Sequence, residues 1–282
     1  MPSGDRLPLT VAATAVGAAL AALVALLAAG AAGVGWWAAP AGGTPRSPAG
    51  GPVVAPPDAV PPWTLIATVH GFATGYDRPG ARQPSTVVSP EIAGVPAALP
   101  VVASKPGWVE VRLMARGSGP ATAWLRASDV SLTRTPYRVV VDLARARVLL
   151  FRRSVLMHCA PAGIGTDQHP TPTGRFFVIL LARPPNPAYG PFVILTSAVA
   201  DTVTDWEQDG VPLVTVEGPL GTGAEVGRTG ARVTTGSIRL SDADLERMKV
   251  LPAGAPIEVT SSLRLGPWDA ARSAPRHARL PC

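Results

Sequence analysis

The sequence predicts a mainly β protein with an N-terminal transmembrane helix, a small β-barrel and a larger β-rich domain that contains one short helix. Three observations lead to this class: an uncharged apolar stretch near the N-terminus, many short alternating runs separated by Gly and Pro, and a single segment with helix start and stop signals. The 282 residues are enough for one large domain or two small ones with appendages.

Residues 1–38 are predicted to enter a membrane. No charged residue lies between Leu7 and Thr44, and the apolar stretch exceeds the roughly 20 residues that a spanning helix needs. This length and the Trp36-Trp37 pair favour a retained single-pass anchor, with the folded part outside the cytoplasm. The alternative is a secreted protein whose signal peptide is cleaved within AAPAGG.

The next segments predict a spacer and a small β-module. Residues 39–62 have the Pro and Gly content of an extended linker. Residues 63–134 contain short β-like runs between turns, of which GWVEVRLM and ATAWLRASDVSL are the clearest. Their two Trp-centred strands and the SDV that follows resemble bacterial SH3-like modules that precede cell-wall enzymes.

Residues 135–261 predict a β-rich domain. YRVVVDL and ARVLLF form a hairpin pattern, followed by the runs GRFFVILL, FVILTS, PLVTVEG and APIEVTSS. SDADLERMKV predicts the one helix, with Ser241 as its cap, Asp244 as the acidic capping partner, Leu245 and Met248 facing inward and Pro252 ending it. The basic tail, residues 262–282, has no periodicity and is predicted to be disordered.

Composition excludes several classes of function. The net charge of +6 comes from scattered arginines rather than from a basic face interleaved with aromatics, so no nucleic-acid partner is predicted. The chain has no HxxxH, no CxxC and no carboxylate cluster with ligand spacing, so neither a metal site nor a cofactor is predicted. The sequence leaves the oligomeric state open.

Two cysteines are too few for a disulfide-dense scaffold. Cys159 follows His158, but neighbouring residues on a strand point to opposite faces, which argues against a catalytic pair. Two interpretations of Cys159 stay open: a small buried apolar residue, or a disulfide with Cys282.

Five stretches in order resemble the L,D-transpeptidase (YkuD-like) catalytic domain, whose members cross-link peptidoglycan stem peptides. They are VVVDLARARVLLF, GIGTDQHPTPTGRFFV, NPAYGPFVIL, TTGSIRLSDADLERM and LPAGAPIEVT, and they span about Tyr137 to Thr260. The order of anchor, Pro-rich spacer, SH3-like module and this domain also resembles the layout of actinobacterial members.

The resemblance implies a cysteine nucleophile, a histidine partner and backbone N–H groups that receive an oxyanion. At the nucleophile position this chain has Ser237, and in place of the His of the His-Gly pair it has Glu217, followed by Gly218. The expected catalytic set is therefore Ser237, Glu217 as a base whose pKa is raised, and the amides of Gly236 and Ser237.

The expected substrate-binding residues are Thr234, Thr235 and Arg239 of the same loop and Gly218 of the upstream Glu-Gly pair. Arg239 has two open roles, a carboxylate contact or a structural ion pair. His169 is retained as a remote candidate base, although an exposed loop histidine is the simpler interpretation.

Two functions follow. The first is an envelope protein of this family that acts on or recognises peptidoglycan stem peptides, with impaired acyl transfer because a serine hydroxyl stays protonated unless a matched base takes its proton. The second is a non-catalytic pseudoenzyme that binds the wall polymer or regulates an active transpeptidase.

Overall fold

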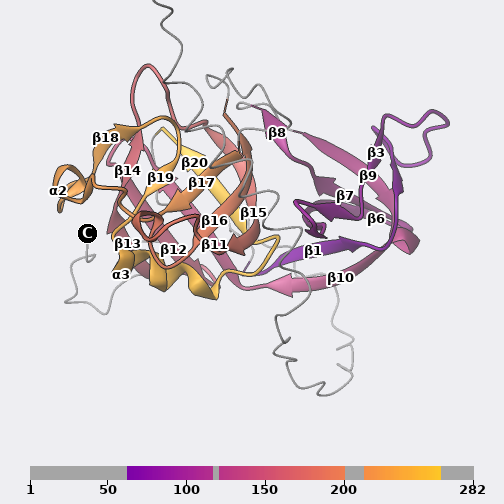
Figure 1. The fold of residues 1–282 in the computed structure, drawn as a ribbon. Helices are drawn as coiled ribbons and strands as arrows, with labels where there is room; N and C mark the ends of the chain where they lie inside the picture. The colour runs from indigo at the N-terminus through magenta and orange to yellow at the C-terminus, as the bar shows by residue number, and fades with distance from the viewer. Residues whose placement is uncertain (1–61, 117–120, 201–212, 262–282) are drawn as a thin grey trace, which may run out of the picture.

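A computed structural model describes residues 62–116, 121–200 and 213–261, and it is mainly β (Figure 1). The predicted anchor at residues 1–38, almost all of the spacer and the tail at residues 262–282 lie outside the described residues. Within the described ranges, no helix is both long and apolar enough to cross a membrane.

Residues 64–135 form a five-stranded antiparallel sheet of order β10-β1-β6-β7-β9. Two small hairpins, β2–β3 and β4–β5, extend it, and a bridge between Tyr76 and Trp124 connects the first hairpin to β9. The strands are β1 (Thr64–Val69), β2 (Ala73–Gly75), β3 (Thr86–Val88), β4 (Glu91–Ile92), β5 (Val95–Pro96), β6 (Ala98–Lys105), β7 (Trp108–Arg112), β9 (Thr122–Arg126) and β10 (Val130–Thr135), with a 3₁₀ turn, η2 (Ala127–Asp129), between the last two.

The remaining strands belong to an eleven-stranded mixed sheet of order β13-β12-β11-β20-β15-β16-β17-β19-β14-β18, with β8 added beside β16. They are β8 (Ala115–Arg116), β11 (Tyr137–Asp142), β12 (Arg147–Arg152), β13 (Val155–Pro161), β14 (Gly163–Gly165), β15 (Gly174–Ala182), β16 (Val193–Val199), β17 (Leu213–Glu217), β18 (Ala231–Thr234), β19 (Ile238–Arg239) and β20 (Pro256–Thr260). The predicted strand runs of this region are thus confirmed as strands.

The predicted hairpin is β11–β12, whose residues pair antiparallel from Tyr137↔Arg152 to Asp142↔Arg147. The buried carboxylate of Asp142 organises the turn, because it accepts the N–H groups of Ala144 and Arg145 and pairs with the Arg145 guanidinium at 2.8 Å. A buried charge is tolerated here since each of its oxygens has a donor.

The predicted helix is α3 (Asp242–Arg247), extended by the 3₁₀ turn η4 (Met248–Val250). Ser241 caps it, since its hydroxyl accepts the N–H of Asp244, and Leu245 and Met248 are buried, as the sequence predicts. The other short helical segments of the described chain are α2 (Gly223–Val226), a single turn, and the 3₁₀ turn η3 (Pro187–Tyr189).

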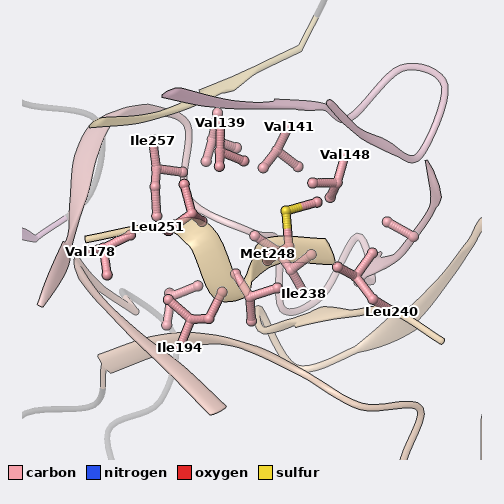
Figure 2. Packing of buried hydrophobic residues seen from close by; sticks show 14 of the residues in the cluster. Val139, Val141, Val148, Val178, Ile194, Ile238, Leu240, Met248, Leu251 and Ile257 are labelled. Atoms are coloured by element: carbon pink, nitrogen blue, oxygen red, sulfur yellow. The ribbon is translucent and has the colours of Figure 1, made fainter. Parts of the chain in front are cut away.

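The main core surrounds α3 and η4. Figure 2 shows Met248 and Leu251 surrounded by side chains from several strands of the large sheet, among them Val141, Ile194 and Ile257. The short helix that follows β19 is therefore held in place by packing against the large sheet.

A second core joins the two sheets. Phe177 and Ile179 of β15 pack in one cluster with residues of the five-stranded sheet, including Leu99 and Val111, whereas Phe176 and Val178 of the same strand belong to the main core. Both faces of β15 are therefore buried, which explains its uninterrupted apolar sequence. The parallel pairing of β8 with β16 adds a backbone connection between the two parts.

Candidate functional site

Ser237 lies in a tight loop between β18 and β19. Gly236 has φ +115°, a conformation that favours glycine, and the Thr234 hydroxyl holds both sides of the loop. This hydroxyl accepts the N–H of Gly236 at 3.1 Å and donates to the carbonyl oxygen of Ser237 at 2.6 Å. Thr234 therefore shapes the loop, and in this conformation it engages the Gly236 amide that the sequence analysis assigns to an oxyanion hole.

Ser237 reaches the carboxyl group of Glu217 through a second hydroxyl. The Oγ of Ser237 lies 3.0 Å from Oγ1 of Thr215, which in turn donates to Oε2 of Glu217 at 2.6 Å. When Glu217 is ionised, the single proton of Thr215 points at its carboxylate, so Ser237 is the donor in its contact with Thr215. The three side chains form one hydrogen-bonded chain that runs from Ser237 to Glu217.

Strand pairing places these groups together. Thr215 and Glu217 are two residues apart on β17, so their side chains share one face. β17 pairs in parallel with β19, with Val216 opposite Ile238 and Glu217 opposite Arg239. Ser237 directly precedes β19, which places its hydroxyl beside the face of β17 that carries Thr215.

Glu217 is an acid in an apolar environment. It is 5% exposed, and burial raises its pKa above the ordinary glutamate value, although the Thr215 hydrogen bond and the charge of Arg239 oppose the shift. Nε of Arg239 lies 3.7 Å from Oε1 of Glu217, which makes an ion pair but is too long for a hydrogen bond. Arg239 also donates from Nη1 to the Thr222 hydroxyl at 3.3 Å, while its buried Nε has no hydrogen-bond partner.

Tyr189 lies within electrostatic reach of the same acid. Burial raises the pKa of its phenol, the charge of Glu217 raises it further and Arg239 opposes the shift. Its carbonyl oxygen accepts the N–H of Gly218 at 2.8 Å. Gly218 is so close to Gly190 that a Cβ atom would lie 2.6 Å from the Gly190 nitrogen, so Gly218 has a packing role.

The structure brings together most of the residues predicted for the site. Ser237, Glu217 and Arg239 lie side by side, and Gly218 and Thr234 support them, whereas Thr235 is exposed on the same loop. Thr215 and Tyr189 are additions that the sequence analysis missed. The signal for Thr215 is the alternation in LVTVE, which places it on the same face as Glu217.

His169 is not bonded to Ser237 in the structure. Its backbone N–H donates to the Thr166 hydroxyl, and its ring Nδ1 is buried without a hydrogen-bond partner. The side-chain partner of the Ser237 hydroxyl is Thr215 instead. His169 therefore stays outside the hydrogen-bonded chain.

Cys159 and His158 belong elsewhere. Cys159 is buried in a small cluster behind the β11–β12 hairpin and is disulfide-bonded, so it is not a free thiol. His158 binds the carboxylate of Asp244 at 2.9 Å. Cys282, the partner that the sequence offers to Cys159, lies outside the described residues.

A cavity of about 150 Å³ lies next to the site. It begins just beyond the ends of β17 and β19, since Pro219 and Leu240 line it, and Asp242 and Asp244 supply carboxylates to its wall. The Asp244 carboxylate is already bonded to His158 and to the Ser241 hydroxyl. In the described part of the chain, no three His, Cys, Asp or Glu side chains gather to hold a metal ion.

Comparison with known proteins finds a family match for part of the chain. Residues 136–259 match the family model of the L,D-transpeptidase catalytic domain (YkuD). No curated protein matches the chain.

Solved structures give distant matches to L,D-transpeptidases. One from Mycobacterium smegmatis has 16% identity and a TM-score of 0.35, covering 57% of this chain and 82% of that one. One from Mycobacterium tuberculosis H37Rv has 17% identity and a TM-score of 0.36, covering 54% and 90%. L,D-transpeptidase 3 from Mycobacterium tuberculosis, in complex with a faropenem-derived adduct, has 15% identity and a TM-score of 0.34, covering 54% and 91%.

Proposed function

We propose that the protein recognises peptidoglycan stem peptides with impaired acyl transfer, on the premise that residues 136–259 match the L,D-transpeptidase catalytic-domain family, a peptidoglycan cross-linking family. The family fold would supply the peptide-binding surface, and the replacement of the family's Cys and His by Ser237 and Glu217 removes its thiol chemistry. The protein is then an envelope component that engages the wall polymer without the rate of a cysteine enzyme.

One observation carries this proposal: the side chain at the nucleophile position is a serine whose hydroxyl contacts a threonine rather than an imidazole. A thiol with a pKa near 8.5 provides some thiolate at neutral pH, whereas an alkyl hydroxyl does not ionise there. The described cysteine, Cys159, is disulfide-bonded and belongs to a separate cluster. No thiol of the described chain is available to Ser237's site.

Two features support retained peptide recognition. The Thr234 hydroxyl makes two hydrogen bonds across the loop from Thr234 to Ser237, so the loop is closed although serine stands where the family has cysteine. The cavity next to it is lined in part by Asp242, whose carboxylate would favour a peptide that carries a free amino group, whereas Asp244 is already bonded to His158 and Ser241.

The cellular setting is proposed from the sequence. The uncharged apolar segment at residues 1–38 would anchor the chain in the cell membrane, or be cleaved as a signal peptide, and the Pro-rich residues 39–62 would hold the folded part away from the bilayer. Residues 63–134, which pack on the larger sheet, would act as an SH3-like module near the wall.

Binding and gain of acylation test the proposal. The full-length protein should sediment with purified peptidoglycan and bind a disaccharide-tetrapeptide, and Ser237→Ala should bind equally well. Ser237→Cys with Glu217→His should acquire a covalent carbapenem adduct at position 237, detected by intact mass spectrometry, with partial restoration of turnover. Loss of binding in every form refutes peptide recognition, and a folded double variant that never acylates refutes the assignment of these two positions.

The entirely non-catalytic alternative, a wall-binding pseudoenzyme or regulator, is favoured by the Glu217–Arg239 ion pair. This pair occupies two groups that catalysis or substrate binding would otherwise use. If the double variant acylates while the native chain leaves every stem peptide unchanged, this alternative is the correct one.

A further inference from the structure

We propose that Thr215 is a positioning residue that links Ser237 to Glu217, and that the three side chains form a hydroxyl relay through which Ser237 accepts the acyl group of a peptide. This inference rests on the proposed function, because it concerns the same site and the same class of substrate. It assigns the residual chemistry of the site to oxygen rather than sulfur, and it assigns a role to a residue outside the expected site.

The relay is continuous and has one direction. Ser237 Oγ and Thr215 Oγ1 are 3.0 Å apart, and Thr215 Oγ1 and Glu217 Oε2 are 2.6 Å apart, both within hydrogen-bond range. Thr215 donates to the carboxyl group and accepts from Ser237, so each hydroxyl proton points toward Glu217. Within the described ranges of the chain, Thr215 is the side chain that hydrogen-bonds to both Ser237 and Glu217, which makes it the connection between them.

The backbone fixes this geometry. Thr215 and Glu217 project from the same face of β17, and Ser237 stands at the start of β19, the parallel neighbour of β17. Thr234 holds the carbonyl of Ser237 at 2.6 Å from the other side of the loop. The donor and its acceptor are thereby held before any substrate arrives, which lowers the entropic cost of reaction.

Glu217 is suited to receive a proton. Its burial raises its pKa above the ordinary glutamate value, which makes its carboxylate a stronger base, and the Thr215 hydrogen bond and the guanidinium of Arg239 at 3.7 Å oppose that shift. The groups that face Glu217 are Thr215 from its own strand, Arg239 from β19 and Tyr189 from η3. None of these is another carboxylate.

The proposed step balances in atoms and charge. Ser237 Oγ forms a bond to the peptide carbonyl carbon, its proton passes to Thr215 Oγ1, and the proton of Thr215 passes to Glu217 Oε2. The carbon–nitrogen bond then breaks, and the leaving amine takes a proton back through the same relay, which leaves an ester on Ser237. A second amine or water attacks this ester, gives its proton to the relay, and Ser237 recovers its own proton as the carbon–oxygen bond breaks.

Removal of the Thr215 hydroxyl tests the relay. Thr215→Val keeps the branched shape of the side chain but has no donor, whereas Thr215→Ser keeps the hydroxyl. Thr133→Val, at an exposed position on β10, is a matched control for the loss of a threonine hydroxyl from a strand. Each full-length variant is incubated with a disaccharide-tetrapeptide, and both the ester at position 237 and the released amine are followed by mass spectrometry.

We expect the native chain to form the ester and Thr215→Val to form it about 100-fold more slowly, the usual scale of a lost proton-transfer path. Peptide affinity should change less than twofold, and Thr215→Ser should restore most of the rate. The native rate should rise with pH as Glu217 ionises, and this rise should flatten in Thr215→Val, which a purely structural role of Thr215 would not produce.

Two results overturn the relay. The first is a native chain that binds the tetrapeptide but forms no ester at any pH, which refutes the relay and leaves the proposed recognition intact. The second is a Thr215→Val variant that acylates at the native rate, which removes Thr215 from the path. Absence of peptide binding in the native chain refutes the proposed function as well, so the two failures are distinguishable.

Discussion

At the scale of single residues, Glu217 is held between two opposing effects. Burial disfavours its charged form, and the Arg239 guanidinium and Thr215 hydroxyl favour that form. The net shift raises its pKa, so burial outweighs the ion pair. At an exposed salt bridge, desolvation is small and the ion pair would lower the pKa of the carboxyl group instead.

Glu217→Gln should change how stability depends on pH. Because the folded-state pKa of Glu217 is raised, its contribution to stability is complete below the unfolded glutamate pKa, about 4.3, and is lost as pH rises through the folded pKa. We expect the free energy of unfolding of the variant, relative to the native chain, to increase over that pH interval. Urea unfolding at a series of pH values measures this difference, and parallel curves would contradict it.

Gly218→Ala should destabilise the fold. Its Cβ atom would lie 2.6 Å from the nitrogen and 2.7 Å from the Cα of Gly190, and backbone atoms cannot rotate away as a side chain does. We expect a loss of about 1–3 kcal/mol, typical of overpacking. Gly71→Ala is the control, since no atom lies within 4 Å of the position that its Cβ would take, and equal stabilities of the two variants would refute the close approach.

The sequence predicts the site residues that belong to local motifs, but not those that the fold brings to the site from other segments. Ser237, Glu217 and Arg239 are identified because they occupy positions in ordered motifs. Thr215 is missed because its importance depends on the pairing of β17 with β19, which joins segments about twenty residues apart, and Tyr189 is missed because it reaches the site from the separate turn η3. Periodicity predicts the face of a strand but not its neighbour in the sheet.

At the scale of elements, the same contrast holds for α3 and β15. The signals for α3 are local, a cap and inward-facing residues, and the structure confirms both. β15 is predicted as a strand, but both of its faces are buried because two sheets pack on it. Its apolar run is compatible with this packing but does not predict which sheets meet there.

Ser241→Ala should weaken α3. The Ser241 hydroxyl accepts the N–H of Asp244 and donates to its carboxylate at 2.5 Å, so the substitution leaves one helix-terminal donor without this acceptor. We expect a loss of about 1 kcal/mol in the free energy of unfolding. Ser241→Thr retains an acceptor and should lose less, and a Ser241→Ala variant as stable as the native chain would show that the cap contributes nothing.

At the scale of the whole molecule, the five-stranded and eleven-stranded sheets share a hydrophobic cluster. Leu99, Val111 and Leu125 of the first sheet pack in the cluster that contains Phe177 and Leu195 of the second. The five-stranded sheet is therefore attached to the larger sheet through a packed interface, and β8 pairs with β16 at its side. Removing either sheet would expose this apolar cluster to water.

Because the cluster is shared, the two sheets should unfold together. Leu99 is 1% exposed on the smaller sheet, and Leu99→Ala should destabilise the protein by about 2–5 kcal/mol through lost burial and a residual cavity. If the interface couples the sheets, calorimetry of Leu99→Ala should show a single unfolding transition at a lower temperature than that of the native chain. Amide hydrogen exchange in this variant should then accelerate in β15 and β16 of the larger sheet as well as in β6 of the smaller one. Val102→Ala, 41% exposed on the same strand, should leave that transition nearly unchanged. Two resolved transitions, with only the smaller sheet affected by Leu99→Ala, would mean that the shared cluster does not couple the sheets and that residues 63–134 fold as an independent module.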